Sequence, residues 1–102
     1  MSELALSAKE VTLRIDRGMT TAFKVDAPED FDGTAELRIY AVGSTEPTVI
    51  TATLDVGDLV FEIDNSVSEV LPSQGRYAVV WTDAEGEPRS IIKGPFFNEA
   101  LP

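Results

Sequence analysis

Hydrophobic and polar residues alternate with a period of two along most of the chain, which is the pattern of half-buried β-strands. In 76–82, for example, Tyr77, Val79 and Trp81 fall on one face. Turn-forming Gly, Pro, Asp and Ser residues separate the alternating segments at intervals of about 8–12 residues. The expected strands are Glu10–Asp16, Thr20–Asp26, Thr34–Val42, Thr48–Val56, Leu59–Asp64, Arg76–Thr82 and Pro88–Phe97.

This spacing predicts an all-β protein, an antiparallel immunoglobulin-like β-sandwich of about seven strands. A small closed barrel is the structural alternative. At most one helical turn is expected, over 65–70, capped by Asn65 or Ser66 and with Val67, Val70 and Leu71 beneath the sandwich. The inward positions expected of the first five strands are Val11, Leu13, Ile15, Thr21, Phe23, Val25, Ala35, Leu37, Ile39, Ala41, Ile50, Ala52, Leu54, Leu59, Phe61 and Ile63.

The 102 residues predict a single domain over 1–102, with 1–9 as a flexible or docking arm and 98–102 as a frayed tail. The turn between the fourth and fifth strands is expected at Gly57-Asp58, and Phe31 is expected to plug one end of the core.

The closing segment 71–97 predicts a β-hairpin that anchors the core, with its turn at 83–86. Ser73 to Tyr77 resembles the tyrosine corner of immunoglobulin-like sandwiches, in which a Tyr hydroxyl bonds to backbone a few residues upstream. In that pattern a Cys follows two positions later, where this chain has Val79. We therefore interpret Tyr77 as a structural corner and Trp81 as core, with an exposed interface aromatic as the alternative for Trp81.

The return strand of this hairpin holds two doubled apolar pairs, Ile91-Ile92 and Phe96-Phe97. One member of each pair points away from the core if the strand is regular. Together with outward residues of other strands, they predict an exposed apolar partner surface. A bulge, or an edge covered by the N-terminal arm, is the alternative. The candidate interface residues are Tyr40, Val80, Ile91, Ile92, Phe96 and Phe97.

Composition limits the chemistry. The chain has neither Cys nor His, so it lacks thiolates, disulfides and the usual general base near neutral pH. We therefore expect that the chain is not an enzyme and that it binds no cofactor. The net charge of −10 disfavours nucleic acid and anionic membranes as partners. The spread of acidic residues indicates a solvated surface, or else electrostatic matching to a basic partner.

The loop 26–33 gathers Asp26, Glu29, Asp30 and Asp32 ahead of Gly33, an arrangement that calcium loops also use. The spacing differs from that of an EF-hand, so we expect no metal site, and calcium binding by this loop stays open. A second acidic cluster, Asp55, Asp58, Glu62 and Asp64, is interpreted as surface, because a chain of this size has little room for a catalytic cleft.

Taken in order, the segments resemble small β-sandwich virion structural proteins of tailed phages, of the LtfC-like type or the N-terminal domain of baseplate upper proteins. The matching stretches cover most of the chain. They are LRIDRGMTTAFKV (13–25), a loop ending in D-x-x-G (30–33), AELRIY (35–40), TATLDVGDLVFEID (51–64), NSVSEVLPSQGRY (65–77) and WTDAEGEP (81–88).

The resemblance implies a non-enzymatic virion component, either a minor tail or tail-tip protein or a capsid accessory or decoration protein. It would be made in the host cytoplasm and bind other virion subunits, as a homo-oligomer or within a symmetric array. The alternative is a generic immunoglobulin-like adhesion or carbohydrate-binding module, with Tyr40 as its first candidate contact. A small enzyme is the least favoured interpretation.

Overall fold

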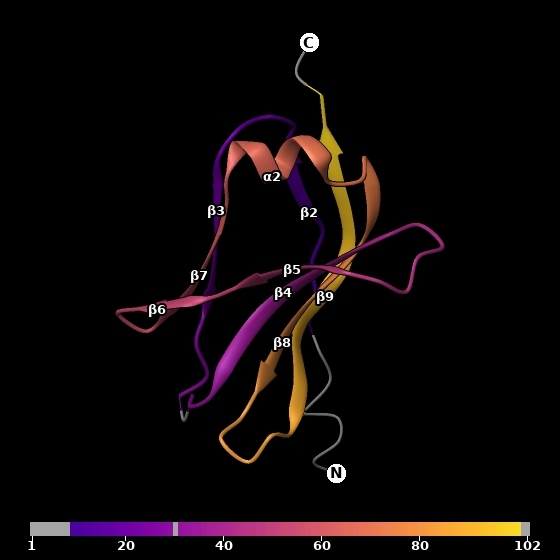
Figure 1. The fold of residues 1–102 in the computed structure, drawn as a ribbon. Coiled ribbons are helices and arrows are strands. Elements are labelled where there is room, and N and C mark those ends of the chain that lie inside the picture. The colour runs from indigo at the N-terminus through magenta and orange to yellow at the C-terminus, as the bar shows by residue number, and fades with distance from the viewer. Residues whose placement is uncertain (1–8, 30, 101–102) are drawn as a thin grey trace.

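Two facing β-sheets and one short helix make up the fold in the computed structural model, which describes residues 9–29 and 31–100 (Figure 1). The prediction of a mostly β protein with sheets in a sandwich-like arrangement is confirmed. The elements are β1 (Lys9–Glu10), β2 (Leu13–Asp16), β3 (Thr21–Asp26), β4 (Thr34–Ala41), β5 (Thr48–Thr51), β6 (Thr53–Asp55), β7 (Asp58–Ile63), α2 (Asn65–Val70), β8 (Gln74–Thr82) and β9 (Pro88–Glu99).

The larger sheet has the strand order β1-β9-β8-β4-β5, and β2 also pairs with β9. We call it the large sheet. The small sheet has the order β3-β7-β6. All pairings are antiparallel except those of β1 and β2, which run parallel to β9. In Figure 1, α2 crosses the end of the molecule between the two sheets.

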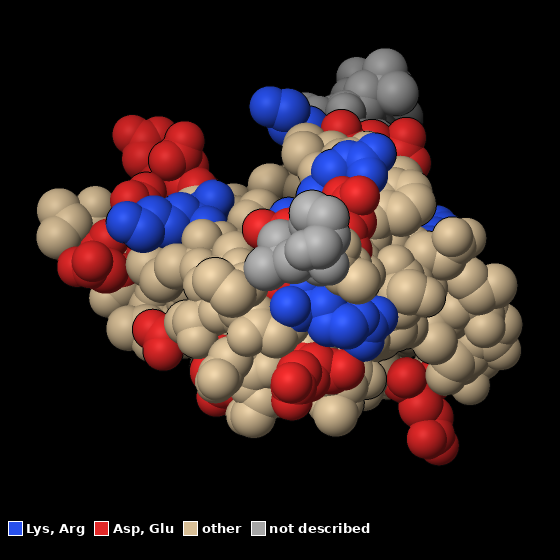
Figure 2. All heavy atoms as spheres, turned by 90° about the horizontal axis from the view of Figure 1, so that it is seen from above, with Lys and Arg blue, Asp and Glu red and all other residues tan. Residues whose placement is uncertain are grey.

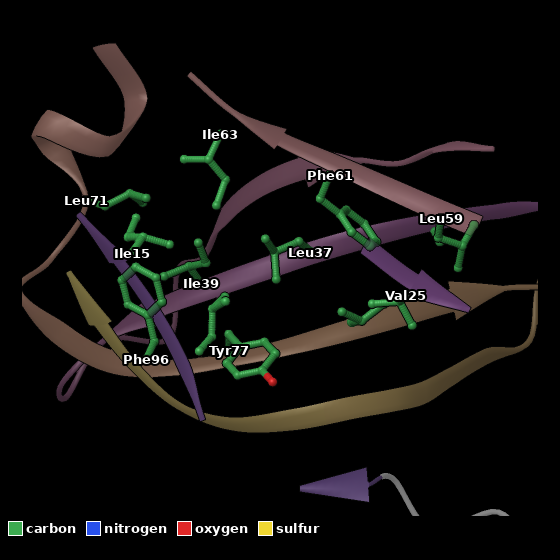
Figure 3. Close-up of a cluster of buried hydrophobic side chains, with 13 residues drawn as sticks. Ile15, Val25, Leu37, Ile39, Leu59, Phe61, Ile63, Leu71, Tyr77 and Phe96 are labelled. Atoms are coloured by element: carbon green, nitrogen blue, oxygen red, sulfur yellow. The ribbon is translucent and has the colours of Figure 1, made fainter. Parts of the chain in front are cut away.

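The core lies between the sheets, where side chains from both point toward one another (Figure 3). The alternation in β4, β7 and β8 predicted its main members, including Leu37, Phe61 and Val79, which are fully buried. Phe31 packs on Trp81 with ring centroids 5.7 Å apart, so it closes one end of the core as expected. Trp81 is buried, and its indole N–H donates to the backbone oxygen of Asp32.

β1 and β2 share one register with β9, with Lys9 opposite Ile92 and Leu13 opposite Phe96, but the pairing is interrupted at 11–12. In this register the oxygen of Val11 would accept from the N–H of residue 95, and Pro95 has none. The hydroxyl of Tyr77 donates to that oxygen instead, at 2.6 Å.

This contact corrects two predictions. Tyr77 is buried and structural, but its hydroxyl bonds to a residue 66 positions away rather than to backbone a few residues upstream. Val11 is exposed rather than inward, because the strand breaks there. Of the expected arm, Lys9 lies in β1, and residues 1–8 are outside the described part of the chain.

The expected strand 48–56 divides at Ala52 into two strands that belong to different sheets. β5 pairs with β4 in the large sheet, and β6 pairs with β7 in the small sheet. Between them, the N–H of Ala52 donates to the oxygen of Ala35 at 2.9 Å. Leu54 was predicted to point inward but is exposed, since β6 is the edge strand of the small sheet.

The β6–β7 turn consists of Val56 and Gly57, one residue earlier than predicted. Both have positive φ, 47° and 84° respectively. Positive φ at both central positions defines a type I′ turn, for which Asn-Gly is the preferred pair. A β-branched residue in this region is an outlier that stores strain.

The helix α2 forms where a helical turn was predicted, but its cap and its buried face differ from the prediction. Asp64 is the N-cap, and its carboxylate accepts from the hydroxyl of Ser66 at 2.7 Å and the N–H of Val67 at 3.0 Å. These two bonds lower the pKa of Asp64. Val70 is exposed rather than packed beneath the sandwich, and Ser68 is buried instead.

The closing hairpin forms as predicted from β8 and β9, with its turn over 83–86. Val79 lies opposite Ile92 and Val80 opposite Ser90, so Ile91 is the extra residue of a β-bulge. The strand then continues to Glu99 with Asn98 buried, which makes the prediction of a frayed tail from residue 98 wrong.

Replacing Tyr77 with Phe is expected to reduce the free energy of unfolding by about 1–2 kcal/mol, because the oxygen of Val11 loses its donor. Burial raises the pKa of Tyr77 above its ordinary value of 10.0. As pH rises through about 10, the Tyr77 hydroxyl ionises in the unfolded chain before it ionises in the folded domain. The wild type therefore loses stability as pH rises through this range, and Y77F lacks this contribution.

Urea unfolding at neutral pH and across the alkaline range measures both effects. The matched control is Tyr40→Phe, which removes a hydroxyl that has no hydrogen bond in residues 9–29 and 31–100 and is expected to change stability by less than about 0.5 kcal/mol. Equal losses in the two variants would contradict the role assigned to the Tyr77 hydroxyl.

Candidate interaction surface

The structure separates the six residues predicted to form a partner surface. Phe96 is 0% exposed and contributes to the core, which corrects its assignment to the surface. Ile91 and Ile92 are half-buried and pack against the core, Ile91 at the bulge and Ile92 opposite Val79. The remaining three, Tyr40, Val80 and Phe97, lie on one face of the large sheet.

That face is the one turned away from the core, and we call it the outer face. Its side chains alternate with buried ones along β4, β8 and β9. Across β4 and β8, Glu36 lies opposite Val80, Arg38 opposite Ala78 and Tyr40 opposite Arg76. No other strand or helix of the described residues lies over it, since the small sheet packs against the inner face of the large sheet, where the core lies (Figure 1).

Phe97 is partly covered within its own chain. The guanidinium of Arg14 lies 4.6 Å from the centre of the Phe97 ring, in a cation–π contact. Arg14 also forms an exposed ion pair with Glu99 at 3.2 Å. Phe97 is therefore a peripheral member of the outer face, and its central apolar part consists of Tyr40, Ala78 and Val80.

One end of the outer face is hollowed. The loop between β4 and β5 stands away from the sheet and forms a hollow of about 530 Å³ with it. A volume in the range of about 300–1,000 Å³ is typical of binding sites. The lining residues are Tyr40, Ala41, Val42, Gly43, Ser44, Thr45, Gly75, Arg76, Tyr77, Ala78 and Lys93.

Two cations stand in this hollow. Ala78 lies opposite Lys93, and Arg76 is two residues before Ala78 on β8, so the two cations are diagonal neighbours. Arg38 nearby is paired with Glu36 at 3.0 Å. By contrast, neither Arg76 nor Lys93 forms an ion pair with any described residue, although Glu10 of β1 lies opposite Lys93.

The opposite, outer face of the small sheet is acidic. Asp26 lies opposite Asp58 across β3 and β7, and Asp58 lies opposite Asp55 across the β6–β7 turn. Glu62 continues the row along β7, and Lys24 is the one basic side chain on the same face of these three strands. The two outer faces thus differ in charge. The outer face of the small sheet is acidic, whereas that of the large sheet carries acidic and basic side chains in equal number, with Arg76 and Lys93 in its hollow.

Sequence analysis missed a buried polar contact beneath α2. The hydroxyl of Ser68 accepts from the N–H of Gly18 at 2.9 Å and donates to the oxygen of Met19 at 3.0 Å. The amide of Asn98 donates to the oxygens of Ser68 and Leu71 at 2.7 and 3.2 Å. Asn98 follows Phe96 at an interval of two, so its inward direction was readable from the alternation. These bonds fix α2 to the β2–β3 turn and to β9.

The acidic loop 26–33 acts structurally in its described part. Asp32 accepts from Trp81 through its backbone oxygen, and its carboxylate accepts from the N–H of Ala84 at 3.4 Å. Asp30 lies outside the described residues. Within residues 9–29 and 31–100, no three or more His, Cys, Asp or Glu side chains are grouped to hold a metal ion.

In the same part of the chain, no helix has both the length and the apolar character needed to cross a membrane. Comparison with protein-family models and with curated proteins finds no match for this chain. The outer face and its hollow are therefore interpreted from their own geometry, which is an aromatic and aliphatic surface with two cations.

Proposed function

We propose that this chain is a non-enzymatic structural domain that binds other protein subunits through the outer face of the large sheet. The observation that supports it most is the half-buried apolar strip of Tyr40, Ala78 and Val80 on the outer face, which no other described strand or helix covers and which lies beside Arg76 and Lys93. Aromatic residues and Arg are enriched in interface cores, and unpaired charges at the border provide orientation.

The finer fold belongs to the same proposal: an immunoglobulin-like sandwich. Its support is the strand order, in which β2, β9, β8, β4 and β5 face β3, β7 and β6. In an immunoglobulin sandwich, strands C, F and G form one sheet, and strands B and E pair in the other. Here β4, β8 and β9 correspond to C, F and G, and β3 and β7 correspond to B and E. A short helix joins the two sheets between β7 and β8.

The biological setting we propose is the virion of a tailed phage, as a minor tail or tail-tip protein or as a capsid accessory protein. Its support is the resemblance in the order of segments, together with a small rigid domain that presents a free sheet face. The domain would be one subunit among other virion proteins, in a homo-oligomer or symmetric array.

Mass spectrometry of particles purified from a phage that encodes this chain tests the setting directly. We expect the chain in the particles at a fixed copy number relative to the major tail or capsid protein. Particles that lack it while infected-cell lysate contains it would contradict the virion assignment. Tyr40→Ala with Val80→Ser is expected to reduce incorporation at least about tenfold, with Val60→Ser on the small sheet as the control.

A carbohydrate-binding module is the second candidate, favoured by the position of Tyr40 in the hollow, opposite Arg76. A glycan array probed with the wild type and with Tyr40→Ala separates the two functions. Binding that disappears in Y40A would support the carbohydrate module, and an array without binding would leave the protein-binding function as the better account.

A further inference from the structure

We infer that the partner in the hollow is a second copy of this chain, and that copies associate head to tail. The tip of the β6–β7 hairpin of one copy, 54–58, would insert into the hollow of the next. We call 54–58 the hairpin tip. The inference rests on the proposed function and names one partner of the same surface.

The hairpin tip is an apolar projection with acidic flanks. Val56 is 97% exposed and Leu54 is 56% exposed. Asp55 and Asp58 lie opposite each other at the base of the turn, directly beside Val56 and Gly57. The tip therefore presents apolar side chains flanked by carboxylates to solvent.

The backbone of the tip favours a different residue. Val56 has φ 47°, a conformation that a β-branched residue adopts only at a cost, whereas Asn fits the same turn without strain. Strain of this kind is concentrated at functional sites. A contact made by the Val56 side chain gives a physical reason for a Val at this position.

The hollow complements the tip in both properties. Tyr40 and Ala78 on the sheet and Val42 on the β4–β5 loop offer apolar contact for Val56, and Arg76 and Lys93 have no ion pair among the described residues. Two carboxylates on the tip thus meet two cations in the hollow. In a chain of net charge −10, this pairing overcomes the general repulsion between copies at one defined place.

The two surfaces lie at opposite ends of the molecule. In Figure 1 the β6–β7 turn projects at the left, and the loop between β4 and β5 projects at the right. Viewed from above, acidic side chains and a basic group lie together at the left-hand end, and the right-hand end is largely uncharged in this view (Figure 2). A chain therefore cannot insert its hairpin tip into its own hollow. Repetition of the contact between copies produces a ring or an open row.

Sedimentation velocity over a concentration series tests the inference with two variants. Val56→Asn removes the apolar contact from the tip while relieving backbone strain, so we expect a higher melting temperature together with association at least about tenfold weaker. Arg76→Glu with Lys93→Glu reverses the charge of the hollow, and we expect the same loss of association. Lys9→Glu with Lys24→Glu, which changes the net charge equally outside both surfaces, is the control and is expected to associate far more strongly than the hollow variant.

Mixing the two defective variants provides the decisive result. V56N retains an intact hollow, and the hollow variant retains an intact tip, so their mixture is expected to form a one-to-one heterodimer and nothing larger. A mixture that stays monomeric would overturn the head-to-tail contact, as would wild-type association unaffected by V56N, or a wild type that is monomeric at every concentration. If association fails while Tyr40→Ala with Val80→Ser still blocks incorporation into particles, the proposed function stands and only the identity of the partner is wrong.

Discussion

Replacing Phe96 with Ala is expected to lower the free energy of unfolding by about 3–5 kcal/mol, because it empties a fully buried aromatic site between the sheets. Phe97→Ala, one residue later, is expected to lower it by about 1 kcal/mol or less, since Phe97 lies on the outer face beneath Arg14. Guanidinium unfolding followed by Trp81 fluorescence measures both values.

The pair of variants tests the direction of each side chain in β9, which determines what the outer face contains. Arg14→Ala is a useful companion, because it removes the cover of Phe97 without touching the core. If Phe97→Ala proves as destabilising as Phe96→Ala, then both rings are core and the composition of the outer face given above is incorrect.

Gly94→Ala is expected to destabilise the domain by about 2–3 kcal/mol through a steric clash with backbone. A Cβ at this position would lie 2.2 Å from the oxygen of Val11 and 2.9 Å from its carbonyl carbon. Neither β9 nor the segment at 11–12 can yield without breaking the pairing of β1 or the bond from Tyr77.

Hydrogen–deuterium exchange of the same variant locates the effect. We expect faster exchange in 9–16 and little change in β3 and β7. Gly86→Ala is the control, because a Cβ there meets no atom within 4 Å and only its positive φ of 88° opposes the change, at about 1 kcal/mol. Equal destabilisation by the two substitutions would show that the close approach of Val11 to Gly94 contributes nothing.

Period-two alternation was sufficient to predict the strands that stay in one sheet along their whole length. It placed Leu37, Phe61 and Val79 in the core and located the closing hairpin. It failed where the backbone changes partner. At Ala52 the chain crosses from one sheet to the other. At Val11 the backbone oxygen finds no N–H in β9, because the residue in that position is Pro95. Neither event alters the local hydrophobic pattern.

The outer face was only partly predictable. Tyr40 and Val80 were expected to point outward, as was one of the pair Phe96-Phe97, but the common location of Tyr40, Val80 and Phe97 follows from the pairing of β4, β8 and β9. Arg76 and Lys93 were missed, because a register between strands 17 residues apart in sequence brings them together. The hollow depends on the path of the β4–β5 loop, which no alternation encodes.

Hydrogen–deuterium exchange of the wild type across a dilution series tests the central claim most directly, because it asks which surface a partner copy covers. We expect protection that grows with protein concentration in 40–45 and in 54–58, with the core strands unchanged. Concentration-dependent protection confined to other segments, or none at any concentration, would contradict an interaction surface on the outer face of the large sheet that binds the hairpin tip of a second copy.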